Sequence, residues 1–145
     1  MILFNSIMLF DDDGDDRAFF HEALLKVAPT CNFIAAVNGK DGLDQLQQTD
    51  TLPQLIFLDL NMPVMNGMQC LAQMRKIKSL RQIPVIIYST TSLFENTEAF
   101  VPFNPVYFLT KPTRFTEIVK ILSFLLYNKW WEDEKITKDR LIVVK

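Results

Sequence analysis

The groups in this sequence that could carry out chemistry stand where short apolar runs end. Five of the seventeen acidic residues lie within positions 11–16, directly after one apolar run, and Asp59 directly follows another. Two further apolar runs lead to Ser89 and Lys111. Carboxylates, a hydroxyl and an ammonium are the groups that a site for a cation and a phosphoryl group requires.

Carboxylates that are brought together in this way repel one another. Two like charges ~4 Å apart repel by about 4 kcal/mol at an effective dielectric constant near 20, so a proton or a cation must offset the charge. Oxygen donors without imidazole or thiolate favour Mg²⁺, which keeps several waters and leaves positions open for a phosphate. A carboxylate held against Mg²⁺ and facing Lys111 could act as a nucleophile towards phosphorus, with Ser89 hydrogen-bonding the transferred oxygens. The chain has only four glycines and no Gly-rich phosphate loop, so we do not expect a bound nucleotide as the donor.

An alternation of short apolar runs and amphipathic stretches predicts the elements that position these groups. Strands are expected at 6–10, 32–37, 55–58, 85–89 and 106–110. Helices are expected at 16–27, 40–48, 67–80, 93–100 and 113–128. The runs at 55–58 and 85–88 are apolar throughout, as in parallel strands that are buried on both faces. We therefore predict a doubly wound α/β fold, in which the carboxyl ends of the strands form a ligand site.

Length and composition limit the function. The 145 residues fit one domain, and 49% hydrophobic and 22% charged residues are typical of a globular chain. A formal net charge of −2 argues against nucleic acid or an anionic membrane surface as the partner. Cys31 and Cys70 form no CxxC motif, the single His21 falls in a predicted helix, and residues 1–10 lack the charge pattern of a signal peptide. We expect a cytoplasmic protein without a membrane span.

Four sequence motifs resemble those of bacterial response-regulator receiver domains of the chemotaxis type. They are FDDDGDDR at 10–17, FLDLNMP at 57–63, IYST at 87–90 and FLTKP at 108–112. The spacings, 30 residues from Asp59 to Ser89 and 52 from Asp59 to Lys111, are typical of receivers. The resemblance implies a flavodoxin-like sheet of five parallel strands in the order 2-1-3-4-5, with helices on both faces. It also implies a stand-alone receiver over 1–128 and a C-terminal tail, 129–145, in place of a separate output domain.

The resemblance assigns a role to each acidic motif. Asp59 is the expected phosphoacceptor and also a ligand of Mg²⁺. Asp12 is expected to bind the metal directly and Asp11 to bind it through a water molecule. The backbone carbonyl of Asn61 would complete the protein's ligands.

The other two motifs have roles in phosphoryl binding and switching. Lys111 and Ser89 are expected to bind the phosphoryl oxygens. As the Ser89 hydroxyl moves inward, it vacates space into which the ring of Phe108, at the switch aromatic position, can turn. The resemblance implies that a histidine kinase or a phosphotransfer protein supplies the phosphoryl group. The protein would then signal through protein contacts and catalyse only its own phosphotransfer and dephosphorylation.

The acidic cluster has alternative interpretations. Asp13, Asp15 and Asp16 fit charges that stabilise a helix start. A calcium loop is disfavoured, because Asp16 stands where that loop requires glycine. A phosphatase of the haloacid-dehalogenase type would use Asp11 as nucleophile and Asp13 as general acid. That alternative leaves the motif around Asp59 unexplained.

The last predicted helix has more apolar residues than one buried face needs. Its core-facing stripe consists of Phe115, Ile118, Val119, Leu122 and Leu126. Ile121 and Phe124 fall off that stripe, and Trp130 and Trp131 follow the helix. Either these residues form a partner surface or the tail 132–145 folds back and covers them.

We expect the output surface in the same part of the chain. The face formed by helix 93–100, strand 106–110 and helix 113–128 is the predicted docking site for a downstream protein or a second copy of this chain. Helix 93–100 is expected to be short, because Pro102 and Pro105 follow it.

Overall fold

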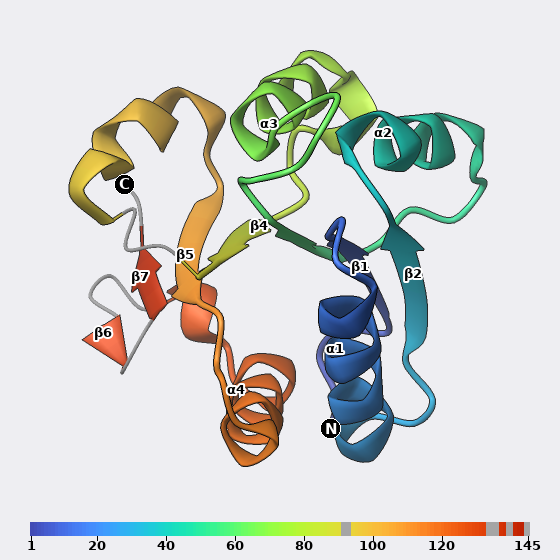
Figure 1. Ribbon diagram of the computed structural model, residues 1–145, viewed down its shortest axis with the longest axis vertical. Coiled ribbons are helices and arrows are strands. Elements are labelled where there is room, and N and C mark those ends of the chain that lie inside the picture. The colour runs from blue at the N-terminus through green and yellow to red at the C-terminus, as the bar shows by residue number, and fades with distance from the viewer. Residues whose placement is uncertain (91–93, 133–136, 139–140, 144–145) are drawn as a thin grey trace.

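Five parallel strands form the centre of the fold in the predicted order (Figure 1). The structure is a computed structural model that describes residues 1–90, 94–132, 137–138 and 141–143. The order β2-β1-β3-β4-β5 confirms the doubly wound fold. The strands are β1 (Ser6–Phe10), β2 (Asn32–Ala36), β3 (Leu55–Leu58), β4 (Val85–Ser89) and β5 (Val106–Thr110). Four of them have the predicted bounds, and β2 ends one residue earlier because the Val37 amide leaves the ladder and donates to Asp41 Oδ2.

Alternate side chains of each central strand enter two separate cores. Ile7 and Leu9 of β1 pack on one side of the sheet, and Met8 and Phe10 pack on the other. Residues of β1, β3 and β4 are all buried. A strand covered on both faces has no solvent-facing positions, which explains why the only serines in these strands, Ser6 and Ser89, stand at a strand end.

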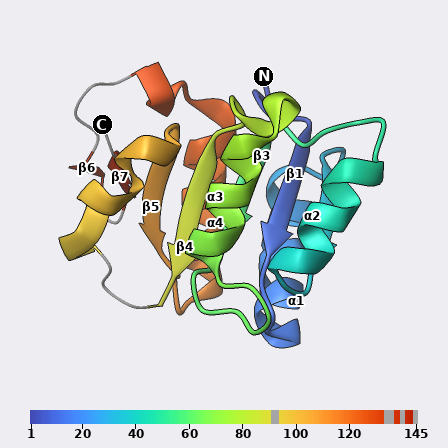
Figure 2. The ribbon, with the colours of Figure 1, turned by 90° about the horizontal axis from the view of Figure 1, so that it is seen from above.

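Helices cover both faces of the sheet (Figure 1, Figure 2). On one face lie α1 (Gly14–Val27) and α4 (Phe115–Tyr127), and on the other α2 (Gly39–Gln48) and α3 (Gly67–Lys76), which a short 3₁₀-helix, Lys78–Leu80, follows. Helix α1 begins two residues earlier than predicted, because Asp13 caps it by accepting hydrogen bonds from the amides of Asp15 and Asp16. None of the helices among the described residues is long and apolar enough to cross a membrane.

The predicted α-helix at 93–100 is wrong. A 3₁₀-helix, Phe94–Phe103, takes its place, and residue 93 lies outside the described residues. Pro102 lies inside this segment and lacks the amide proton that a regular α-helix would use there. The segment is tied to α3 by Arg75, whose guanidinium donates hydrogen bonds to the carbonyls of Phe103 and Pro105 at 2.6 and 2.9 Å.

Part of the C-terminal tail extends the sheet beyond the five predicted strands. Strand β7 (Leu141–Val143) pairs antiparallel with β5, and β6 (Thr137–Lys138) pairs antiparallel with β7. In this register Phe108 lies opposite Ile142. The sheet therefore has seven strands, and β5 has neighbours on both sides.

Of the two alternatives left open for Trp130, exposure on a partner surface is excluded, because the residue is buried. Its side chain is only 2% exposed, packs edge to face on Tyr107, and donates a hydrogen bond from Nε1 to the carbonyl of Leu125 at 2.8 Å. Ile121 and Phe124 are partly buried against the same core. Trp131 is 38% exposed and is therefore the one of these four residues that keeps a large exposed surface.

Candidate functional site

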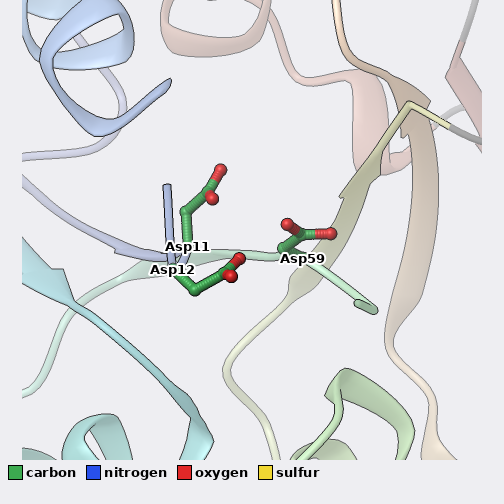
Figure 3. A group of neighbouring side chains, drawn as sticks. All are labelled: Asp11, Asp12 and Asp59. Atoms are coloured by element: carbon green, nitrogen blue, oxygen red, sulfur yellow. The ribbon is translucent and has the colours of Figure 1, made fainter. Parts of the chain in front are cut away.

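Three carboxylates meet at the carboxyl ends of the neighbouring strands β1 and β3 (Figure 3). Asp11 and Asp12 directly follow β1, and Asp59 directly follows β3. The Asp59 amide donates a hydrogen bond to the carbonyl of Phe10 at 3.0 Å, so the two strand ends are held in register. One oxygen from each of the three carboxylates lies within 4.8 Å of the others. Asp11 and Asp59 are buried and Asp12 is exposed, so the group opens to solvent on the side of Asp12.

The loop after β3 is folded tightly around Asp59. The Asn61 amide donates a hydrogen bond to Asp59 Oδ1 at 3.2 Å, and the Gly67 amide donates one to the carbonyl of Leu60 at 2.9 Å. A Cβ at Gly67 would collide with the Asp59 carbonyl and lie 2.7 Å from Leu60 Cα. Position 67 therefore needs glycine, because the start of α3 lies directly against the backbone of the acidic residue.

Lys111 supplies the positive charge of the site. Its Nζ lies 2.7 Å from Asp11 Oδ2, 2.9 Å from Asp16 Oδ2 and 3.2 Å from Asp59 Oδ2. The Lys111 amide donates to the carbonyl of Ser89 at 2.8 Å, which fixes the end of β5 beside the end of β4. With this lysine, the predicted groups from β1, β3, β4 and β5 lie at one edge of the sheet.

Burial and pairing have opposite effects on the charges of this site. Burial raises the pKa of Asp11 above its usual value, although hydrogen bonds from Lys111 and from the Asp13 amide lower it in part. Burial alone would lower the pKa of Lys111, but its hydrogen bonds to Asp11 and Asp16, together with the charges of Asp11 and Asp59, outweigh burial and raise that pKa. Lys111 is therefore a firmly charged ammonium.

The donor set fits a hard divalent cation. Asp11, Asp12 and Asp59 together with Asp16 carry four negative charges, and Lys111 is the ion-pair partner of Asp11, Asp16 and Asp59. The exposed Asp12 carboxylate has no ion pair among the described residues. Three oxygen donors, with an excess of negative charge and an opening to solvent, are what Mg²⁺ or Mn²⁺ requires.

The two predicted switch residues are both buried. Ser89 is 4% exposed at the end of β4, and Phe108 is 1% exposed in the middle of β5. The ring of Phe108 packs edge to face on Phe100 of the 3₁₀-helix, with 4.8 Å between centroids. Phe108 thus lies in the core between the sheet and the α2–α3 side.

One site residue was missed in the sequence. Asp16 was predicted to be a charge at a helix start, and in the structure it is one of the three carboxylates on Lys111. Asp13 has the predicted helix-start role, and Asp15 is exposed. His21 lies on α1 and stacks on Phe33, as an ordinary helix residue would. The sequence pattern predicts that Asp16 lies in the first turn of a helix. Its contact with Lys111 depends on how α1 is placed relative to the end of β5, which the pattern does not predict.

Comparisons with known proteins agree with this geometry. Residues 7–123 match the model of the response regulator receiver domain. The protein PilG of Pseudomonas aeruginosa is 32% identical over 114 residues, which cover 78% of this chain and 81% of PilG. The sensor histidine kinase CheAY of Helicobacter pylori is 30% identical over 108 residues, which cover 73% of this chain and only 13% of CheAY.

A solved structure extends the similarity to the fold. The Mn²⁺-bound form of the response regulator Rcp1 superposes with a TM-score of 0.74 and 27% sequence identity, and the match covers 86% of this chain and 96% of Rcp1. The family match covers more than half of the chain, and it includes both strand ends that carry the carboxylates. The chain therefore belongs to the response regulator receiver domain family.

Proposed function

We propose that this chain accepts a phosphoryl group on Asp59 from a phosphohistidine of a sensor histidine kinase or a phosphotransfer protein. The observation that carries the proposal is the position of the Asp59 carboxylate. It is 6% exposed, lies among the carboxylates of a candidate metal site, and has Oδ2 3.2 Å from Lys111 Nζ. A carboxylate between a divalent cation and an ammonium is well placed to attack phosphorus.

The transfer needs no other nucleophile. An Asp59 oxygen forms a bond to phosphorus while the P–N bond of the phosphohistidine breaks, and the imidazole nitrogen leaves with the electron pair. Lys111 offsets the charge of the phosphoryl oxygens, and the Ser89 hydroxyl donates to one of them. The chain then acts on itself alone, by phosphotransfer and by later hydrolysis of the acyl phosphate.

The proposed metal is Mg²⁺, which supplies further charge neutralisation at the phosphoryl oxygens. Asp12 and Asp59 would bind it directly, Asp11 through a water molecule, and Asn61 through its backbone carbonyl. Support comes from the three clustered carboxylates and from the solved structure of Rcp1, which binds Mn²⁺. Mn²⁺ and Mg²⁺ share a preference for oxygen ligands.

The output of the proposed switch is a change in protein contacts. Phe108 connects the site to the outer face, because its ring contacts Phe100 of the segment Phe94–Phe103. A downstream protein or a second copy of the chain would contact the surfaces of Phe94–Phe103 and α4 on either side of β5, which is itself buried and paired with β7. We place the receiver unit at 1–128 and a tail at 129–145, of which Leu141–Val143 pairs with β5. We place the protein in the cytoplasm, which suits its free Cys31 and Cys70.

The phosphatase alternative has no support at Asp11. Both oxygens of Asp11 have closer partners than those of Asp59, since Oδ1 accepts a hydrogen bond from the Asp13 amide at 3.0 Å and Oδ2 pairs with Lys111 at 2.7 Å. The corresponding distances at Asp59, to the Asn61 amide and to Lys111, are both 3.2 Å, so Asp11 is the more tightly held carboxylate. The family model that matches residues 7–123 is that of the receiver domain.

Intact-mass measurement tests the proposal. Incubation with acetyl phosphate and Mg²⁺ should add one phosphoryl group to the wild type and to the control Asp50→Ala, which changes an exposed aspartate far from the site. Asp59→Ala should add none. Phosphorylation that persists in Asp59→Ala, or turnover of a phosphomonoester that is lost only in Asp11→Asn, would overturn the assignment.

A further inference from the structure

Asp16 contacts Lys111 but has no role in the function proposed above. It lies in the first turn of α1, and its Oδ2 is 2.9 Å from Lys111 Nζ. The backbone at Asp16 is held in place by the helix cap, because its amide and that of Asp15 both donate hydrogen bonds to the side chain of Asp13. The Asp16 side chain is 42% exposed, whereas that of Lys111 is only 8% exposed.

The three carboxylates on Lys111 are of two kinds. An ammonium has three N–H donors, and here they are shared among Asp11, Asp16 and Asp59. Asp11 and Asp59 belong to the group that could hold a cation, and Asp16 does not. A divalent cation in that group would share the charge of Asp11 and Asp59 and would also repel the ammonium.

Lys111 has space to move if it is released. A pocket of about 340 Å³ opens beside its side chain and is lined in part by Asp16, Tyr88 and Thr113. The ring of Tyr88 lies 5.6 Å from Nζ, a weaker contact than a carboxylate makes. An ammonium that turned into this pocket would leave Asp59, and the phosphoryl oxygens would lose their positive partner.

We propose that Asp16 is a positioning residue, which keeps Lys111 beside Asp59 when a divalent cation occupies the carboxylate group. The inference rests on the function proposed above. Without the cation, Asp11 and Asp59 hold the ammonium, so Asp16 adds little. With the cation bound, Asp16 is the only one of the three carboxylates whose charge remains fully available to Lys111.

Phosphorylation kinetics give the first test. Asp59 attacks the phosphorus of acetyl phosphate, the bond from phosphorus to the acetyl oxygen breaks, and acetate leaves with the electron pair. At saturating Mg²⁺, Asp16→Asn should lower the maximal rate about three- to fivefold, because a partly exposed ion pair is lost. Asp16→Glu, which keeps the charge, should restore part of the rate. The matched control is Asp15→Asn, which removes the same charge one residue away, where the carboxylate is exposed and pairs with no cationic side chain in the described part of the chain.

A spectroscopic test does not depend on phosphorylation. The ammonium ¹⁵N signal of Lys111 should be observable in the wild type both without metal and with saturating MgCl₂. In Asp16→Asn it should be observable without metal and lost to exchange with water when MgCl₂ is added. Retention of the signal in Asp16→Asn with MgCl₂, or an equal loss of rate in Asp15→Asn, would overturn the positioning role. Phosphorylation of Asp59→Ala would instead overturn the proposed function and leave the Lys111 signal as an independent result.

Discussion

Replacement of Lys111 by methionine should change the stability of the protein in a way that depends on pH. The substitution keeps a linear side chain of similar length and removes the ammonium. Asp11 and Asp59 are 0% and 6% exposed, so they would be left buried without their counter-charge. An uncompensated buried charge is among the most destabilising changes that a single substitution can make.

The expected loss follows from the distances. At an effective dielectric constant near 20, the attraction of Lys111 is about 6 kcal/mol to Asp11 at 2.7 Å and about 5 kcal/mol to Asp59 at 3.2 Å. Several kcal/mol of this are offset by the cost of taking the ammonium out of water. We therefore expect Lys111→Met to lower the free energy of unfolding at pH 7 by about 3–5 kcal/mol.

The pH dependence has a definite sign. Burial already raises the folded-state pKa of Asp11 above its ordinary value of 3.8. A carboxyl group with a raised folded pKa favours the folded state below its unfolded pKa, and this contribution is lost as the pH rises through the folded pKa. Without Lys111 the folded pKa of Asp11 rises further, so Lys111→Met should recover stability relative to the wild type as the pH falls from 7 towards 5.

Urea unfolding at pH 7 and pH 5, with and without MgCl₂, measures both effects. Lys40→Met is the matched control, because Lys40 and Asp44 also form an ion pair at 3.0 Å, but both side chains are more than half exposed. Its loss should be at most about 0.5 kcal/mol and independent of these conditions. Added Mg²⁺ should stabilise Lys111→Met more than the wild type, because the cation replaces the missing positive charge. A loss in Lys111→Met no larger than that in Lys40→Met, with no recovery at pH 5, would refute the reasoning.

Two further substitutions test the packing around the site and the tail. Gly67→Ala should lower the free energy of unfolding, measured in urea, by about 1–3 kcal/mol, because the added Cβ would collide with the Asp59 carbonyl. The same substitution should slow phosphorylation. Its control, Gly14→Ala, should change the free energy of unfolding by less than about 0.5 kcal/mol, because the added Cβ would lie 3.4 Å from a flexible arginine side chain. Trp130→Ala should cost about 3–5 kcal/mol in the same assay, whereas the more exposed Trp131→Ala should cost about 1 kcal/mol or less; equal losses would contradict the packing described here.

The central part of the fold was predictable because local pattern and tertiary environment agree there. Residues 55–58 and 85–88 are apolar without interruption, and only strands buried on both faces need such runs. Once the strands are parallel, the residues after them must meet at one edge. This topological rule is why Asp59 and Lys111 could be placed together from sequence, although they are 52 positions apart.

The errors arose where distant contacts decide the structure. The 3₁₀-helix Phe94–Phe103 contains Pro102 and is held by Arg75 from another element, which no pattern within 93–100 reveals. The sequence left both burial and exposure of Trp130 open, because its burial involves contact with Tyr107, more than twenty positions earlier. Asp16 was correctly placed at a helix start, but its contact with Lys111 follows from packing between α1 and the end of β5. Strand β7 pairs with β5 across a long separation, which local propensity does not predict.

The pairing of β7 with β5 changes what another molecule meets at this side of the sheet. An edge strand presents a row of free backbone amides and carbonyls, to which a foreign strand can add. Here the chain fills that row itself, and the backbone of Phe108 has a neighbouring strand on each side. The outermost strand is β6, which is two residues long and offers a very short template for strand addition. A partner that responds to the position of the Phe108 ring must therefore recognise side chains and helix surfaces, because both edges of β5 are already paired with strands of the same chain.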